Sequence, residues 1–237
     1  MMTTLNTSIT DFAAQAVRDA AIAFAGLRDT HTISPSGTVN FVERVPGEAA
    51  VVSIGYPGPF APDAELKPTI YTLEGDVLQG PPNANLGGGR YLPIFRAHDD
   101  ITTVSHVHTP YLGAWSQSHR ALPIRYVPVQ RWTRARELPI YIDRRQGEAN
   151  FILEILAENP QVPAILEANG GSTAWGRKGL LALANYIVLL EEGARLQALA
   201  ETLGGSQDYG PGVLEQQWKM SGLIRETDRF EDAIAAE

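Results

Sequence analysis

The 237-residue sequence contains no cysteine, which excludes disulfide bonds, thiolate metal sites and a cysteine nucleophile. Basic side chains are also scarce, because 19 Lys and Arg stand against 27 Asp and Glu, a formal net charge of −8. Nucleic acids and anionic membrane surfaces are bound by clustered Lys and Arg, so we expect neither as a partner. No run approaches the roughly 20 apolar residues of a membrane span, and the first residues lack a signal-peptide pattern. We therefore expect a cytoplasmic protein.

The length and a hydrophobic content of 44% favour one domain over residues 1–237, with a core over about 9–204 and a C-terminal helix and tail over 205–237. Apolar residues at helical spacing predict helices over 9–27, 90–97, 111–119, 150–160, 179–203 and 213–224. Alternating or β-branched runs predict strands over 39–45, 49–56, 69–73, 101–109, 125–132, 138–143 and 163–170. A glycine-rich loop over 80–88 is long enough to favour a functional role.

The segment His106-Val107-His108 is the sharpest chemical feature of the sequence. Because side chains alternate along a strand, both imidazoles point to one face, with Cα atoms about 7 Å apart. That spacing suits two ligands of one divalent ion, although packed or hydrogen-bonded histidines are the alternative. Thr109-Pro110-Tyr111 follows and starts a helix, so the pair lies at the C-terminal end of a strand, where such folds place sites.

Three segments together resemble the class II aldolase/adducin family, which includes fuculose-phosphate aldolase, ribulose-phosphate 4-epimerase and several decarboxylases. They are Val39 to Arg44, which keeps Asn40 and Arg44 of the first signature, His98 to Tyr111 around the two histidines, and Ile165 to Gly171 with the long helix after it. The resemblance runs from about residue 9 to about 204. It implies an α/β fold of three layers (αβα), with a central, mostly antiparallel sheet and helices on both faces. It also implies a homotetramer with active sites between adjacent subunits.

The resemblance also implies a metal site that this sequence has altered. Family members bind zinc, manganese or a similar ion through three histidines, and the match puts two of them on His106 and His108. The third falls on Gly170, and the acid/base glutamate of the family falls on Gly88. Two ligands bind a divalent ion weakly. Zn, Mn or Fe is therefore expected only if His119, Glu167 or an acidic residue of a neighbouring subunit completes the site; otherwise the metal has been lost.

Phosphate recognition is altered too, because the phosphate-binding positions of the family fall on Pro57-Gly58, Leu86-Gly87 and Val39-Asn40. Losing hydroxyl donors removes the hydrogen bonds that hold a phosphate, so we expect a non-phosphorylated substrate. Arg131 and Arg134, on either side of Trp132 and Thr133, could clamp the carboxylate of a small or aromatic organic acid; a solvated, salt-bridging strand is the alternative.

The first functional hypothesis is a carbon–carbon lyase, an aldolase or decarboxylase, that acts through an enolate-like intermediate. The candidate catalytic residues are His106, His108, Tyr111 and His119, and the candidate substrate-binding residues are Asn40, Gly88, Arg131, Arg134, Asn169 and Gly170. The alternative is a non-catalytic binding or scaffold module, as in adducin, or a metal-independent enzyme.

Overall fold

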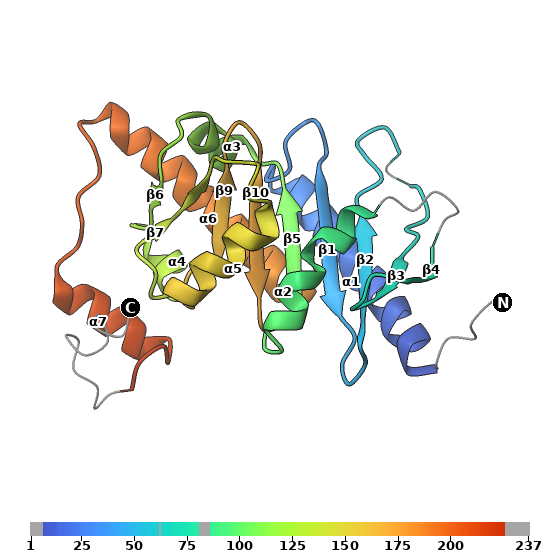
Figure 1. Ribbon diagram of the computed structural model, residues 1–237. Helices are drawn as coiled ribbons and strands as arrows, with labels where there is room; N and C mark the ends of the chain where they lie inside the picture. Colours follow the sequence, from blue (N-terminus) through green and yellow to red (C-terminus); the bar gives the residue numbers. More distant parts are fainter. Residues whose placement is uncertain (1–6, 62, 81–85, 226–237) are drawn as a thin grey trace. The chain divides into compact units, whose positions relative to one another are not determined.

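The computed structural model describes residues 7–61, 63–80 and 86–225 (Figure 1). The chain divides into two compact units. The first comprises Met1–Thr109 and Thr173–Asn185, and the second comprises Pro110–Ser172 and Tyr186–Glu237. The prediction of a single domain over 1–237 stays a prediction.

The first unit is built on an antiparallel sheet with strand order β4-β3-β2-β1-β5-β10. Tight hairpins join β1 to β2 and β3 to β4, and β1 also pairs antiparallel with β5. Its elements are α1 (Thr7–Asp29), β1 (Val39–Arg44), β2 (Ala50–Gly55), β3 (Thr69–Thr72), β4 (Val77–Gln79), η1 (Leu86–Tyr91), α2 (Leu92–Ala97), β5 (Thr103–Val107) and β10 (Ser172–Gly176).

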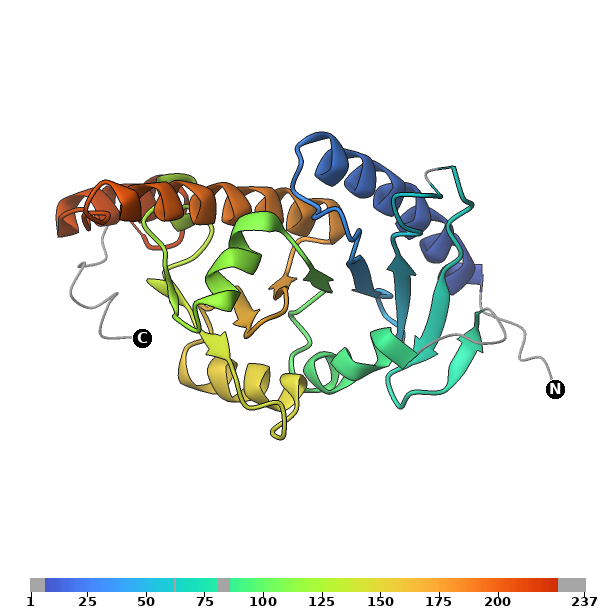
Figure 2. The same cartoon turned by 90° about the horizontal axis from the view of Figure 1, so that it is seen from above.

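Helices cover both faces of this sheet. Figure 2 shows α1 on one face of the strands and α2 on the other. A sheet covered on both faces buries successive residues, and this explains why Phe41, Val42, Val51 and Val52 all have 0% exposure. The covered strand β5, buried at every position, carries His106 into the interior of the unit and ends one residue before the half-buried His108.

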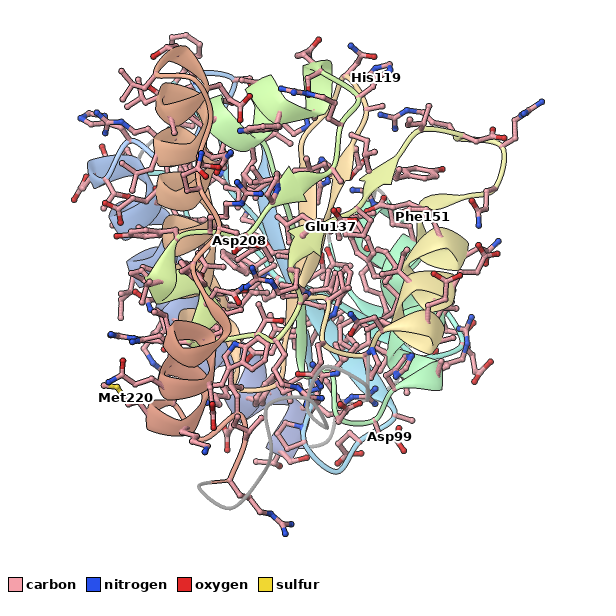
Figure 3. The ribbon with its side chains drawn as sticks, turned by 90° about the vertical axis from the view of Figure 1, so that its left-hand side faces the viewer. Asp99, His119, Glu137, Phe151, Asp208 and Met220 are labelled. Carbon is pink, nitrogen blue, oxygen red and sulfur yellow. The ribbon has the colours of Figure 1, made fainter. Side chains whose placement is uncertain are left out.

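The second unit has shorter strands. Strands β8 and β9 pair in parallel, with Ile140 opposite Leu166, and β6 pairs antiparallel with β7. Figure 3 shows Phe151, which lies on α5, and Met220, which ends α7, on opposite sides of these strands. The elements are α3 (Pro110–Gln117), β6 (Leu122–Pro123), α4 (Val127–Gln130), β7 (Glu137–Leu138), β8 (Ile140–Tyr141), α5 (Glu148–Glu158), β9 (Ala164–Glu167), α6 (Leu180–Thr202), which begins in the first unit, and α7 (Pro211–Met220).

Most predicted elements are confirmed to within a few residues, but the strand predicted over 125–132 is wrong. That segment forms the helix α4, with Tyr126 as N-cap and Pro128 in the first turn. Proline is tolerated there because the first N–H groups of a helix have no intrahelical acceptor. The strand predicted over 138–143 is interrupted at Pro139, which has no N–H to give to a ladder.

Two further points concern loops. The glycine-rich loop predicted over 80–88 includes residues 81–85, which lie outside the described residues, and continues into the 3-10 turn η1. None of the helices in the described part of the chain combines the length and the apolar character needed to cross a membrane.

Candidate functional site

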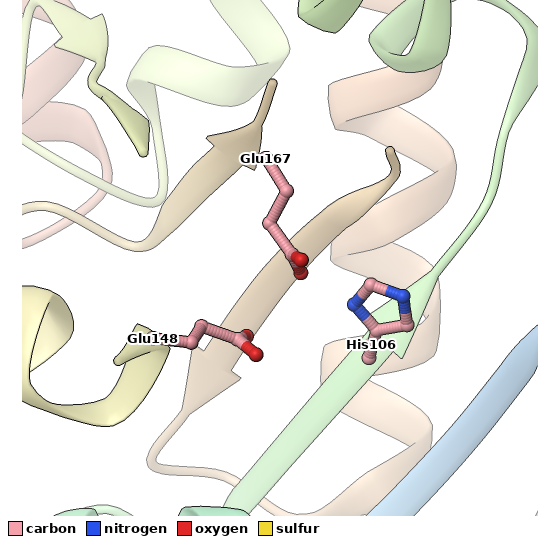
Figure 4. A group of neighbouring side chains, drawn as sticks. All are labelled: His106, Glu148 and Glu167. Carbon is pink, nitrogen blue, oxygen red and sulfur yellow. The ribbon is translucent and has the colours of Figure 1, made fainter. Parts of the chain in front are cut away.

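His106 and His108 face each other in the first unit. His106 lies in β5 (Figure 4) and His108 follows the strand, so the two side chains share a face, as predicted. Their Nε2 atoms are 3.1 Å apart, and the rings meet edge to face with centroids 5.1 Å apart. His106 is 9% exposed and His108 is half-buried. The pair is therefore preorganised, with two ring nitrogens directed at one point.

The other ring nitrogen of His106 also has a partner within this unit. Nδ1 lies 3.1 Å from Oγ1 of Thr173 on β10, and the hydroxyl of Tyr91 lies 3.3 Å from the same oxygen. Thr173 and Tyr91 are both 0% exposed. Histidines that bind metals usually donate their second ring N–H to an oxygen, which fixes the ring and leaves the first nitrogen as the ligand.

Asn40 and Arg44, the two residues that carry the first family signature, contact backbone. The Asn40 side-chain oxygen accepts the backbone N–H of His106 at 3.3 Å, so Asn40 supports the strand that bears the pair. Arg44 donates to the carbonyls of Phe95, His98 and Ile101 and so satisfies the C-terminal end of α2. A substrate contact of Asn40 stays a prediction.

A second group of polar side chains lies in the second unit. Glu148 opens α5 and Glu167 ends β9 (Figure 4), and a carboxylate oxygen of each lies within 4.8 Å of the other. Glu167 is 3% exposed, and Nη1 of Arg144 lies 3.5 Å from its Oε2. A buried carboxylate needs a compensating cation or hydrogen bonds, and here Arg144 supplies part of that compensation. Carboxylates placed this close are also ligands that divalent ions accept.

Gly170, the position at which the resemblance puts the third histidine, lies beside the same arginine. Nη2 of Arg144 donates to the carbonyl of Ala168 at 3.0 Å. A Cβ atom on Gly170 would lie 3.2 Å from that Nη2 and 3.3 Å from the carbonyl oxygen of Glu167. The guanidinium therefore occupies space that a side chain at position 170 would need.

His119 and Asn169 are brought together in the second unit. His119 Nε2 lies 2.6 Å from Asn169 Oδ1, and the Asn169 amide donates to Gln117 at 2.8 Å. Both have left-handed backbones, with φ of 55° for His119 and 56° for Asn169. Such conformations in residues other than glycine are uncommon and gather at functional sites. Both side chains are exposed.

The remaining candidates are held in several parts of the chain. Tyr111 is the second residue of α3, and its ring lies 5.9 Å from the guanidinium of Arg195. Arg131 donates to Gln217 of α7 at 2.7 Å, and Arg134 follows in the loop after α4. Gly88 lies in η1, in the part of that turn for which only the backbone is described.

Sequence reasoning named Glu167 as a candidate ligand but missed Glu148, Arg144, Thr173 and Tyr91. Glu148 lies just before the helix predicted over 150–160, whereas in the structure the helix begins at Glu148 itself. Arg144 gave no signal, since its contacts depend on the turn after β9. The ring of Trp132 stacks on Tyr186 with centroids 5.0 Å apart.

The comparison with known families decides the assignment. Residues 66–198 match the model of the Class II Aldolase and Adducin N-terminal domain, which is more than half of the chain. The chain belongs to this family. The predicted α/β fold with a central multi-strand sheet is confirmed by solved structures of the same fold.

Three solved structures illustrate the fold. An L-fuculose 1-phosphate aldolase superposes with a TM-score of 0.71 at 15% identity, over 87% of this chain and 95% of its own. YgbL from Escherichia coli, described as an aldolase, epimerase or decarboxylase, gives 0.66 at 17% identity, over 87% and 97%. An aldolase II superfamily protein from Pseudomonas syringae gives 0.67 at 17% identity, over 94% and 90%. At these identities the likeness shows the fold alone.

Proposed function

We propose that this class II aldolase family member is a carbon–carbon lyase that binds a divalent metal ion through His106 and His108. The observation that carries the proposal is the 3.1 Å distance between the two Nε2 atoms. Two imidazole nitrogens on one tetrahedral zinc ion, each at about 2.05 Å, lie about 3.3 Å apart. The hydrogen bond between His106 Nδ1 and Thr173 leaves Nε2 as the ligand atom, which also fits a metal site.

Two nitrogen ligands are too few for a tightly bound ion, so the proposal needs further donors. We infer that His119, Glu167 or an acidic residue of an adjacent subunit supplies them. A mixed set of imidazole and carboxylate ligands suits Zn, Mn or Fe. Glycine stands at position 170, where the family has its third histidine, so we infer that another residue supplies that ligand.

The chemistry that we propose is decarboxylation or retro-aldol cleavage of a non-phosphorylated small or aromatic organic acid. A divalent ion held by His106 and His108 would supply Lewis-acid stabilisation of negative charge on a substrate oxygen. Tyr111 or His119 transfers a proton to or from the substrate. Asn169 orients His119 through the 2.6 Å hydrogen bond, and Arg131 and Arg134 attract the substrate carboxylate.

The assembly and compartment belong to the proposal as well. A homotetramer in the cytoplasm, with each site completed by an adjacent subunit, is consistent with apolar side chains on the surface of α6. Leu196 and Leu199 on α6, and Leu203 just after its end, are 44%, 49% and 87% exposed and recur at helical spacing. Light scattering of the purified chain measures the number of subunits, and a monomer at micromolar concentration would contradict this part.

The test of the metal proposal is elemental analysis of the untagged protein. We expect about one Zn, Mn or Fe per chain, and less than a tenth of that in a His106→Ala/His108→Ala variant. His31→Ala, at an exposed histidine outside the site, is the control and should keep the metal. Glu167→Gln should bind the metal ion more weakly. Organic acids are then screened for CO₂ release or aldehyde formation. Wild-type protein that takes up no ion, even in micromolar excess, would contradict the proposal.

A second candidate function is a non-catalytic binding module or a metal-independent enzyme. The observation in its favour is the contact of Arg144 with Glu167, because a fixed cation there compensates the carboxylate charge without a metal. Metal-free wild-type protein with no lyase activity would support a binding module. Activity that persists after chelation would support a metal-independent enzyme.

A further inference from the structure

Four side chains form a hydrogen-bonded line that starts in the interior of the first unit and ends with the histidine pair. The hydroxyl of Tyr91 lies 3.3 Å from Oγ1 of Thr173, and that oxygen lies 3.1 Å from Nδ1 of His106. Nε2 of His106 lies 3.1 Å from Nε2 of His108. Tyr91 and Thr173 are fully buried and His106 is 9% exposed, so these bonds lie in a region of low dielectric.

The direction of these hydrogen bonds decides which nitrogen of His106 carries the proton. Neutral imidazole has one N–H donor and one acceptor nitrogen, and a hydroxyl has a single proton to donate. If the Thr173 proton points to Nδ1, that nitrogen is the acceptor and Nε2 carries the hydrogen. If the Thr173 proton points to Tyr91, its oxygen accepts from Nδ1–H, and the lone pair of Nε2 faces His108.

We propose that Tyr91 and Thr173 are positioning residues that hold His106 in the Nδ1-protonated tautomer. The phenol oxygen of Tyr91 accepts the proton of Thr173, and Thr173 Oγ1 accepts Nδ1–H of His106. The Nε2 lone pair of His106 then accepts Nε2–H of His108 in the metal-free protein. The tautomer so fixed is the one that leaves His106 Nε2 able to bind a metal ion, and in this respect the inference rests on the proposed function.

Thr173 alone would make the hydrogen bond to His106, and the structure gives a reason for the presence of Tyr91 as well. A threonine hydroxyl alone can turn either way beside an imidazole, because it is both donor and acceptor. With phenylalanine at position 91, the proton of Thr173 loses this acceptor and turns to His106 Nδ1. His106 then carries its proton on Nε2 and donates to His108. Tyr91 thus acts on the histidine without touching it.

The experiment measures the tautomer directly, on full-length metal-free protein labelled with ¹⁵N-histidine, at a pH well above the usual imidazole range. The His106 signals are assigned with the His106→Ala variant. In the wild type we expect a pyrrole-type Nδ1 and a pyridine-type Nε2. In Tyr91→Phe and Thr173→Val we expect the two types to exchange, whereas Thr173→Ser, which restores the hydroxyl, should give the wild-type spectrum.

Tyr71→Phe is the matched control. Tyr71 is also a buried tyrosine of the first unit, and its hydroxyl is hydrogen-bonded to a threonine, Thr69. The Tyr71→Phe substitution should leave the His106 tautomer unchanged. A thermal melt of each variant verifies that it is folded. An Nε2-protonated His106 in the wild type, or an unchanged tautomer in folded Tyr91→Phe, would overturn the proposal.

The metal measurement separates this inference from the function on which it rests. Titration with Zn²⁺ alone should give a Kd about ten- to a hundredfold higher in Tyr91→Phe and Thr173→Val than in the wild type or Tyr71→Phe. If the wild type binds no Zn²⁺ but the tautomers change as expected, the hydrogen-bond chain stands and the metal function fails. If Zn²⁺ binds equally to all four proteins, the positioning role is wrong although the metal function stands.

Discussion

The carboxylate of Glu191 accepts the backbone N–H of Tyr111 at 2.7 Å and that of Leu112 at 2.9 Å. Glu191 belongs to α6, and the two N–H groups are among those of the first turn of α3, which have no intrahelical acceptor. A side chain 79 and 80 residues away in the sequence therefore caps the helix that carries Tyr111. Glu191 is 6% exposed, so water does not compete effectively for these bonds.

Replacing Glu191 should destabilise the protein by an amount that depends on the new residue. Gln keeps one acceptor oxygen, and we expect a loss of about 1–2 kcal/mol in the free energy of unfolding. Ala leaves both N–H groups without the carboxylate, and we expect about 2–4 kcal/mol. Urea unfolding measures both. Glu192→Gln, at the exposed neighbouring position, is the control; an equal effect there would show that the cap is not responsible.

Glu43 gives a pH-dependent prediction. Burial, above all, raises the pKa of Glu43 above 4.5, and the negative charge of Asp19 adds to it, while hydrogen bonds from the backbone N–H of Leu180 and from Thr103 lower it. Because the folded state holds the proton more tightly than the unfolded chain, the stabilising contribution is complete below pH 4.5 and is lost as the pH rises through the raised pKa.

Glu43→Gln cannot ionise, so it should remove this dependence. The free energy of unfolding of the wild type minus that of Glu43→Gln should therefore fall as the pH rises from about 4.5 toward neutrality. Urea unfolding at several pH values tests this, with Glu65→Gln, at an exposed glutamate, as control. A difference that grows with pH would show that the carboxylate is favoured in its charged form.

Periodicity predicted the elements whose burial follows their own sequence. The helices at 7–29 and 180–202 and the strands β1 and β2 are examples. Periodicity failed where contacts with neighbouring elements decide the local structure. Residues 172–176, Ser-Thr-Ala-Trp-Gly, have weak strand character but form β10, in which the first four residues are buried. At 127–130, valine alternation indicated a strand, and the position of Pro128 in a first turn made a helix.

The same distinction applies to the candidate site. The shared face of His106 and His108 follows from strand alternation alone and was predicted. The partner of His106, Thr173, lies 67 residues away and depends on β10, which was not predicted. Arg144 reaches Glu167 across the turn that follows β9. Such contacts join segments distant in sequence, and no local spacing encodes them.

Asn169 has a left-handed backbone and makes two side-chain hydrogen bonds, and substitutions can separate these effects. Asn169→Gly keeps the backbone conformation and loses the bonds, so we expect a cost below about 1 kcal/mol. Asn169→Ala loses both and should cost about 1–2 kcal/mol. Chemical denaturation compares them. An alanine variant as stable as the glycine variant would show that the φ of 56° causes no strain.

Gly170→Ala should be destabilising for a specific reason. The new Cβ would meet Arg144 Nη2 at 3.2 Å and the Glu167 carbonyl oxygen at 3.3 Å, so the guanidinium or the turn must shift. We expect a loss of about 1–2 kcal/mol. Gly26→Ala is the matched control, because a Cβ there meets nothing within 4 Å. In that exposed helical position alanine should stabilise by about 0.5–1 kcal/mol.

A double-mutant cycle then assigns the cause of the Gly170 effect. On an Arg144→Ala background the contact with Nη2 is absent, and the contacts with the carbonyl oxygen and the Cβ of Glu167 remain. Gly170→Ala should therefore cost about 0.5–1 kcal/mol less on that background than in the wild type. Equal costs on both backgrounds would mean that the turn alone rejects a side chain. A reduced cost would mean that Arg144 keeps position 170 closed to the histidine that the family places there.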